Sequence, residues 1–210
     1  MPAPSHRPVE QNALIERAKQ GDLRAFEQLL ADHVPRIRRF ARSMCKSSSD
    51  ADDLAQDALL KAYLALRSYR FSAAFSTWLY RVVRNTFIDH ARHELARQRA
   101  QAAAGALEAP VDAQQTTPPD EQLAQGELRA ALWDAVRALP LEYRATVVLF
   151  DVEGLSHEEV AAVEGVAVGT VKSRLSRGRS QLRDLLRARG VLGDGNAPQV
   201  ELVQSRRPVP

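Results

Sequence analysis

Residues 154–186 constrain the fold of this chain more than any other segment, because they carry the signals of a helix, a sharp turn and a second helix. Ser156 and Glu159 have the spacing of a capping box, which predicts that the first helix begins at Ser156. Gly165 stands where a helix-turn-helix needs a residue that tolerates positive φ. The segment therefore predicts a helix-turn-helix.

The second helix of this segment combines an apolar side with a concentration of cations. Val171, Leu175 and Leu182 recur at helical spacing and predict the buried side. Cationic and hydroxyl side chains lie between them and can reach phosphates and base edges in the major groove of DNA. These candidate DNA-binding residues are Thr170, Lys172, Ser173, Arg174, Arg177 and Arg179. The alternative interpretation is an ordinary amphipathic hairpin with a solvated basic face.

Glu164 stands just before the turn, where such segments often have an apolar residue. Two arrangements are open at this point. The side chain either faces solvent or pairs with a neighbouring arginine.

Composition favours a helical protein, and because the sequence shows no secretory signal and no phosphate-binding glycine loop, we expect it to be cytoplasmic and to need no cofactor. Of the 210 residues, 45% are hydrophobic and 26% are charged, and helix-forming alanine, leucine, arginine and glutamate dominate. No apolar run approaches the roughly 20 residues that a membrane span needs, so we expect no membrane insertion. Cys45 is the single cysteine, which excludes an intrachain disulfide and a multi-cysteine zinc site. The order of His90, His93 and Glu94 differs from the patterns of zinc peptidases, so we expect no metal.

The pattern along the chain predicts an all-α protein of two small helical domains joined by a flexible linker. Apolar residues recur at helical spacing through residues 12–97 and again through residues 119–189. Residues 98–118 lack aromatic side chains and have little apolar periodicity, which predicts the linker. Residues 1–11 are expected to form a disordered leader and residues 190–210 a flexible tail.

A helix expected to begin at Asp50 is acidic at its N-terminal end, although the chain has a net charge of +3. Carboxylates at such an end stabilise the helix dipole, which is one interpretation of the cluster. The other interpretation is a mixed acidic and apolar surface patch that suits a basic protein partner. The members of this patch are Asp53, Leu54, Gln56 and Asp57.

An aromatic loop with Tyr69 and Phe71 precedes a long helix, which is expected from Thr77 to about Arg97. Trp78 belongs either to the core or to the surface that the loop forms with this helix. The polar side of the helix offers cations that can hold phosphates and an amide that can contact a base edge. These candidate residues are Arg81, Arg84, Asn85, Asp89 and Arg92.

Four stretches in a fixed order resemble one bacterial family. The stretch QGDLRAFEQLL is similar to the family's opening helix, and DADDLAQDALLKAYLAL is similar to its polymerase-binding helix. FSTWLYRVVRNTFIDHAR is similar to its promoter-melting helix, and the helix-turn-helix to its upstream-element reader. Residues 20–97 and 120–188 together resemble the extracytoplasmic-function group of sigma-70-type transcription initiation factors.

The resemblance implies a sigma factor, not an enzyme, that brings the RNA polymerase core to promoter DNA and helps to open the duplex. Residues 12–97 would be sigma region 2, and residues 119–189 would be sigma region 4. The acidic patch would dock on the clamp coiled coil of the largest polymerase subunit. The aromatic loop and long helix would grip the minus-ten element and stack a flipped-out base, and the helix-turn-helix would bind the minus-thirty-five element. The resemblance also implies an anti-sigma factor as a partner.

Two alternatives remain at this point. A free-standing helix-turn-helix regulator would bind DNA tightly without polymerase and would need a dimerisation surface. An interaction protein with a sigma-like fold that only sequesters an anti-sigma factor would have little use for the arginines of both domains.

Overall fold

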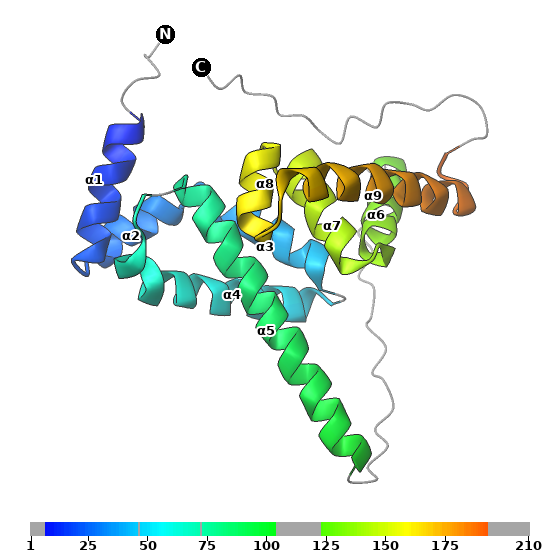
Figure 1. Ribbon diagram of the computed structural model, residues 1–210, viewed down its shortest axis with the longest axis horizontal. Helices are drawn as coiled ribbons and strands as arrows, with labels where there is room; N and C mark the ends of the chain where they lie inside the picture. Colours follow the sequence, from blue (N-terminus) through cyan, green and yellow to red (C-terminus); the bar gives the residue numbers. More distant parts are fainter. Residues whose placement is uncertain (1–6, 46, 72, 104–122, 193–210) are drawn as a thin grey trace.

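The structure is a computed structural model that describes residues 7–45, 47–71, 73–103 and 123–192. Helices account for all the regular secondary structure in these ranges, which confirms the predicted all-α class (Figure 1). None of the helices in these ranges has the length and hydropathy needed to cross a lipid bilayer.

The N-terminal bundle consists of helices α1 to α5 and the short 3₁₀ turn η1. Their bounds are α1 Arg7–Lys19, α2 Leu23–Leu30, α3 Val34–Met44, α4 Ser48–Ala65, η1 Leu66–Ser68 and α5 Phe75–Ala103. Asp22 caps α2 by accepting a hydrogen bond from the amide of Ala25 at 3.0 Å. Pro35 lies in the first turn of α3, where its missing N–H has no intrahelical partner to lose. The second half of α5 extends away from the rest of the molecule (Figure 1).

The C-terminal bundle consists of helices α6 to α9 and a π-helical turn, η2. Their bounds are α6 Leu123–Ala138, α7 Leu141–Val147, η2 Val148–Val152, α8 His157–Glu164 and α9 Val168–Ala188. Ser156 and Glu159 form the predicted capping box at the start of α8. Gly165 ends that helix with a φ of 69°, as expected for the turn before α9. The predicted helix-turn-helix is therefore confirmed as a local structure.

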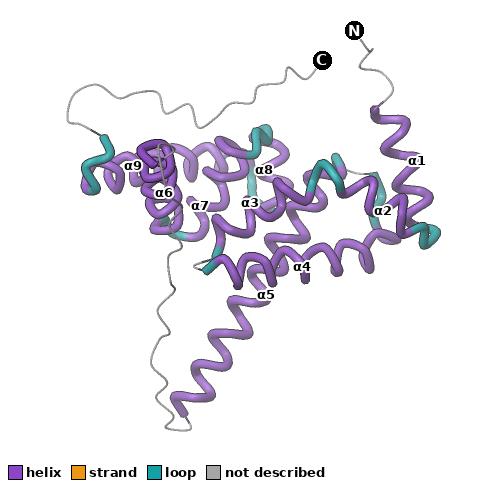
Figure 2. Tube along the Cα trace, turned by 180° about the vertical axis from the view of Figure 1, so that it is seen from behind, coloured by secondary structure: helices purple, strands orange, loops and turns teal. Residues whose placement is uncertain are grey.

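The two bundles pack against each other. Helix α3 contacts α6, α7 and η2, and α5 contacts α8; Figure 2 shows the two bundles in contact from behind. The buried apolar side chains of both bundles belong to one contiguous cluster, which includes Phe40 and Val83 from the first bundle and Val147 and Val160 from the second. The sequence predicted two helical units but not this docking.

Several predicted boundaries differ from the structure. Residues 7–11, expected in the disordered leader, form the beginning of α1. Helix α4 begins at Ser48 and not at Asp50, because the Ser47 hydroxyl caps it by accepting from the Asp50 amide at 3.0 Å. Helix α5 continues to Ala103, into the predicted linker. The predictions for residues 1–6, 104–122 and 193–210, which include the first four residues of the predicted second domain, lie outside the described residues.

Candidate protein and nucleic-acid interfaces

The acidic patch on α4 is only partly a surface. Asp53 and Gln56 are exposed, and Asp57 is half-buried. Leu54 is fully buried in the core, so the prediction that it belongs to the surface patch is wrong. Leu54 lies on the same inner side of the helix as Ala58, and both belong to the hydrophobic core.

Exposed leucines extend this surface along α4. Leu60 and Leu64 are 58% and 69% exposed, among the largest exposures of apolar side chains in the described part of the chain. They follow Asp53, Gln56 and Asp57 at spacings of three or four residues, which place side chains on one helix face. The sequence analysis missed both leucines, although this spacing could have identified them. The face is therefore acidic at one end and apolar at the other.

Asp57 also joins α4 to α5. Its carboxylate lies 2.8 Å from Nε2 of His90 and 3.2 Å from Nζ of Lys61. Burial opposes ionisation here, but the hydrogen bonds from His90 and Lys61 outweigh it and lower the pKa of Asp57. Lys61 also lies 3.9 Å from the exposed Asp89, so the pairs hold the outer parts of the two helices together.

The aromatic loop is built around a buried tyrosine. Tyr69 donates a hydrogen bond to the carbonyl of Ala73 at 2.6 Å, and its ring lies 5.3 Å from that of the half-buried Trp78. Phe71 is 41% exposed, and its φ of 56° is a left-handed conformation that non-glycine residues rarely adopt. Lys19 of α1 places Nζ 4.4 Å from the centre of the Phe71 ring. The loop thus presents Phe71 at the surface on a base of packed rings.

The predicted polar residues of α5 fall into two groups. Asn85, Asp89 and Arg92 are exposed. Arg81 is also exposed, but it donates from Nε to the carbonyl of Ala162 in α8 at 2.9 Å. Arg84 is half-buried, and burial lowers its pKa although the charge of Glu164 opposes that effect. The C-terminal bundle therefore engages Arg81 and Arg84.

Glu153 lies at the centre of the contact between the bundles, just after η2. Its side chain is fully buried. One carboxylate oxygen accepts from Nε of Arg36 at 3.0 Å and from the hydroxyl of Tyr80 at 2.6 Å, and the other accepts from Nε of Arg39 at 2.7 Å. Burial, followed by the charge of Glu153, raises the pKa of Tyr80, so its hydroxyl stays protonated and donates. The sequence analysis did not identify this cluster.

Helix α9, the second helix of the helix-turn-helix, presents part of the predicted set. Lys172, Ser173 and Arg177 are exposed, and Thr170 is half-buried. Arg174 turns back toward α8, where its Nη1 lies 2.5 Å from the buried carboxylate of Glu164. This contact selects the second of the two arrangements open for Glu164, pairing with an arginine. Glu164 also accepts from the hydroxyl of Thr146 at 2.5 Å.

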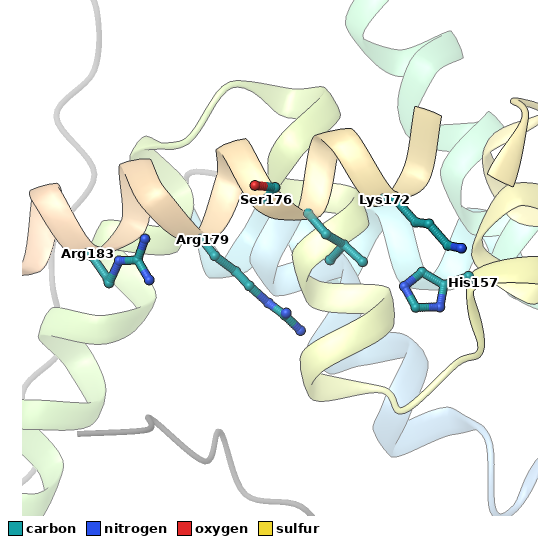
Figure 3. Close-up of a pocket in the computed structure, with 6 residues that line it drawn as sticks. His157, Lys172, Ser176, Arg179 and Arg183 are labelled. Atoms are coloured by element: carbon teal, nitrogen blue, oxygen red, sulfur yellow. The ribbon is translucent and has the colours of Figure 1, made fainter. Parts of the chain in front are cut away.

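Arg179 belongs to a cationic hollow beside α8. Its Nε donates to Asp151 at 3.0 Å, and its guanidinium lies 5.4 Å from the centre of the Phe150 ring. The hydrogen bond with Asp151 raises the pKa of Arg179. Lys172, Arg179 and Arg183 extend from the same side of α9 around a hollow of ≈ 290 Å³, with His157 beside Lys172 (Figure 3). The cations that line the hollow give it the charge to attract an anionic backbone.

Comparisons with known proteins agree with this division into two bundles. Two family models match: Sigma-70 region 2 over residues 29–97, and Sigma-70, region 4 over residues 129–182. The chain is 40% identical over 166 residues to the ECF RNA polymerase sigma factor SigM of Mycobacterium tuberculosis, and the match covers 79% of each chain. It is 33% identical over 178 residues to the ECF RNA polymerase sigma-E factor of Escherichia coli, covering 80% of this chain and 90% of the other.

Two solved structures have a similar fold over most of the chain. The sigma factor RpoE from Bartonella quintana, in complex with the anti-sigma factor NepR, has a TM-score of 0.60 and 30% identity over 77% of this chain and 96% of its own. CnrH, in complex with the cytosolic domain of CnrY, has a TM-score of 0.60 and 28% identity over 85% of this chain and 98% of its own.

Proposed function

This chain belongs to the extracytoplasmic-function group of the sigma-70 family, and from that premise we propose which of its residues perform each part of initiation. A sigma factor of this kind binds the RNA polymerase core, directs it to specific promoters and promotes opening of the DNA. The observation that carries the assignment is the match of both sigma regions, in order, to one chain. A free-standing regulator is not favoured, because it has no need for region 2.

The polymerase contact is assigned to the exposed face of α4. Asp53 and Gln56 are accessible, and Leu60 and Leu64 add an apolar area beside them. An acidic and apolar face is complementary to a basic partner helix with apolar side chains, and it repels DNA. We assign this face to the clamp coiled coil of the largest polymerase subunit.

The minus-ten contact is assigned to the aromatic loop and the polar side of α5. Phe71 is exposed and available for stacking on a flipped-out base, and the Trp78 ring packs against Tyr69 of the same loop. Asn85 and Arg92 are exposed on the same helix and can reach a base edge and a phosphate. Arg81 is exposed as well but donates to α8, and the half-buried Arg84 becomes fully available only when α8 moves away.

The minus-thirty-five contact is assigned to the N-terminal half of α9. Lys172, Ser173 and Arg177 are exposed there and can enter the major groove. Arg179 and the hollow around it are placed to hold a phosphate. Arg174 forms an ion pair with Glu164, and we assign it to holding α9 in place against α8.

Several further assignments follow from the family. The predicted limits for region 2, residues 12–97, and for region 4, residues 119–189, stay our proposal. We assign no reaction to the chain itself, because the polymerase performs the chemistry, and we place it in the cytoplasm with that enzyme. The structure of RpoE with the anti-sigma factor NepR supports an anti-sigma partner for this chain as well.

A binding assay with purified bacterial core polymerase tests the α4 assignment. The variants are Asp53→Arg and the pair Leu60→Ser with Leu64→Ser. We expect both to weaken core binding at least tenfold, since each removes one half of the proposed face. Glu27→Arg is the matched control, because it makes the same charge change at an exposed position of α2. Equal binding by Asp53→Arg and the control would contradict the assignment.

A further inference from the structure

The cluster around Glu153 has the composition of an anion-binding site. All of its donors belong to the N-terminal bundle: Arg36 and Arg39 on α3, and Tyr80 on α5. The acceptors are the carboxylate of Glu153 and, for Nη2 of Arg36, the main-chain carbonyl of the same residue, which belongs to the C-terminal bundle. Arg39 binds it through two nitrogens, with Nε 2.7 Å from one oxygen and Nη2 3.0 Å from the other. This fork geometry suits a phosphate as well as a carboxylate.

The donors need an anion when the bundles separate. The side chains of Arg36 and Arg39 are 37% and 39% exposed, and Tyr80 is buried. Two neighbouring guanidinium groups keep their charge at any physiological pH. Without Glu153 the two guanidinium groups would repel each other, and the hydroxyl of Tyr80 would lose the acceptor that it has in the docked arrangement.

The docked arrangement also engages two arginines of the proposed minus-ten surface, the exposed Arg81 and the half-buried Arg84. Arg81 follows Tyr80 on α5 and donates to the carbonyl of Ala162, and Arg84 lies near Glu164. If these arginines bind promoter DNA, which rests on the proposed function, their contacts with α8 must first break, and we expect α8 to move away. The same movement withdraws Glu153 and leaves the donor cluster open next to the DNA.

We propose that Arg36, Arg39 and Tyr80 form a binding site for a backbone phosphate of promoter DNA, and that Glu153 occupies this site while the bundles are docked. The carboxylate of Glu153 is then a competitor of the phosphate. Docking and DNA binding exclude each other at this site, so the chain alone is held in a form with reduced affinity for DNA.

The first test uses the full chain and a labelled oligonucleotide of about 12 thymidines, which offers phosphates without a promoter sequence. Glu153→Gln removes the competing charge while keeping the shape of the side chain. We expect it to bind the oligonucleotide several-fold more tightly than the unchanged chain. An affinity equal to that of the unchanged chain would overturn the proposed competition.

A matched pair of triple variants separates the site from simple net charge. One combines Glu153→Gln with Arg36→Gln and Arg39→Gln, and the other combines it with Arg38→Gln and Arg42→Gln. All four arginines lie on α3, and Arg38 and Arg42 are exposed. We expect the first triple variant to lose the affinity that Glu153→Gln gains. Its plot of log binding constant against log salt concentration should also become less steep, by about 0.7 for each phosphate contact that is lost. Equal losses in the two triple variants would mean that only net charge matters, which would overturn the site.

A second measurement uses the unchanged chain and therefore does not depend on the folding of a variant. Arginine modification by phenylglyoxal is mapped at Arg36 and Arg39 in the free chain, in its complex with core polymerase, and in that complex with promoter DNA. We expect both arginines to be protected in the free chain, reactive in the complex with core polymerase, and protected again when promoter DNA is added. Reactivity that persists with DNA would overturn the phosphate site. Absence of any complex with core polymerase would instead contradict the proposed function, while the oligonucleotide assay would still test the site.

Discussion

Arg174 and Glu164 form an ion pair that fixes the recognition helix α9 to the end of α8, with Nη1 of Arg174 2.5 Å from Oε2 of Glu164. The Glu164 side chain is 1% exposed and that of Arg174 is 22% exposed. Removal of one partner from a buried pair leaves an uncompensated charge, which costs about 3–5 kcal/mol. We therefore expect Arg174→Ala to lower the free energy of unfolding by about that amount, measured by urea denaturation.

Arg177→Ala is the control for this prediction. Arg177 is exposed three residues further along α9, so its loss should change the free energy of unfolding by no more than about 0.5 kcal/mol. It should weaken binding to duplex DNA of the minus-thirty-five element, because an arginine–guanine pair is worth about 1–3 kcal/mol. If Arg174→Ala were as stable as the unchanged chain and lost more DNA affinity than Arg177→Ala, then Arg174 would be the DNA contact, and this prediction would be contradicted.

Two glycines of α9 are expected to respond oppositely to alanine. A Cβ at Gly178 would lie 2.9 Å from Cγ2 of Val147 and 3.2 Å from Cβ of Tyr143, so Gly178→Ala should destabilise the packing of α7 on α9 by about 1–3 kcal/mol. A Cβ at Gly169 meets no atom within 4 Å, and Gly169→Ala should stabilise by about 0.5 kcal/mol. Thermal unfolding of both variants measures the difference, and equal midpoints would contradict the close packing at Gly178.

The local features of the fold were accessible from the sequence. The capping box of Ser156 and Glu159 and the turn at Gly165 depend on residues within a few positions, so spacing alone identifies them. The exposure of Asp53 and Gln56 follows from helix periodicity in the same way. The same periodicity places Leu54 beside Ala58 on the inner side, and the patch prediction failed because it ignored this phase.

The contact between the bundles could not be predicted from one sequence. Arg36 and Glu153 are 117 residues apart, and their pairing depends on how two helical units dock. Nothing in the run of apolar residues before Glu153 indicates where its carboxylate finds donors. The inward turn of Arg174 was equally hidden, because Arg174 and Arg177 look alike in the sequence until the position of Glu164 in space is known.

Phe71 is expected to act through its ring and not through its backbone. Its positive φ would be as strained with leucine as with phenylalanine, so Phe71→Leu keeps that strain while removing the aromatic face. Binding of single-stranded minus-ten DNA by the complex with core polymerase should fall by about 1–3 kcal/mol, the value of one base stack. Phe71→Tyr keeps the ring and should retain affinity. Equal losses in the two variants would contradict stacking.

Cys45 is expected to react slowly with alkylating agents. Burial, and secondly the charge of Asp50, raise the pKa of its thiol to about 11. At about pH 8 the thiolate fraction should be ~200-fold below that of an ordinary thiol, and alkylation should accelerate about tenfold per pH unit toward pH 10. Because the folded chain holds this proton more tightly, the thiol's contribution to stability falls as pH rises from about 8.5 through 11. The rates of alkylation by iodoacetamide in the native and the urea-unfolded chain measure the suppression of the thiolate. Equal rates in the two states would contradict the raised pKa.

Run-off transcription with bacterial core polymerase and a genomic promoter library tests the central claim most directly. The unchanged chain and Glu27→Arg should both produce transcripts from defined start sites, and the aligned sites should give the minus-ten and minus-thirty-five elements. Asp53→Arg should lose these transcripts while remaining folded, because the reversed charge lies on the proposed polymerase-binding face of α4. If the unchanged chain gave no core-dependent transcripts and bound DNA tightly by itself, the result would contradict its action as a sigma factor.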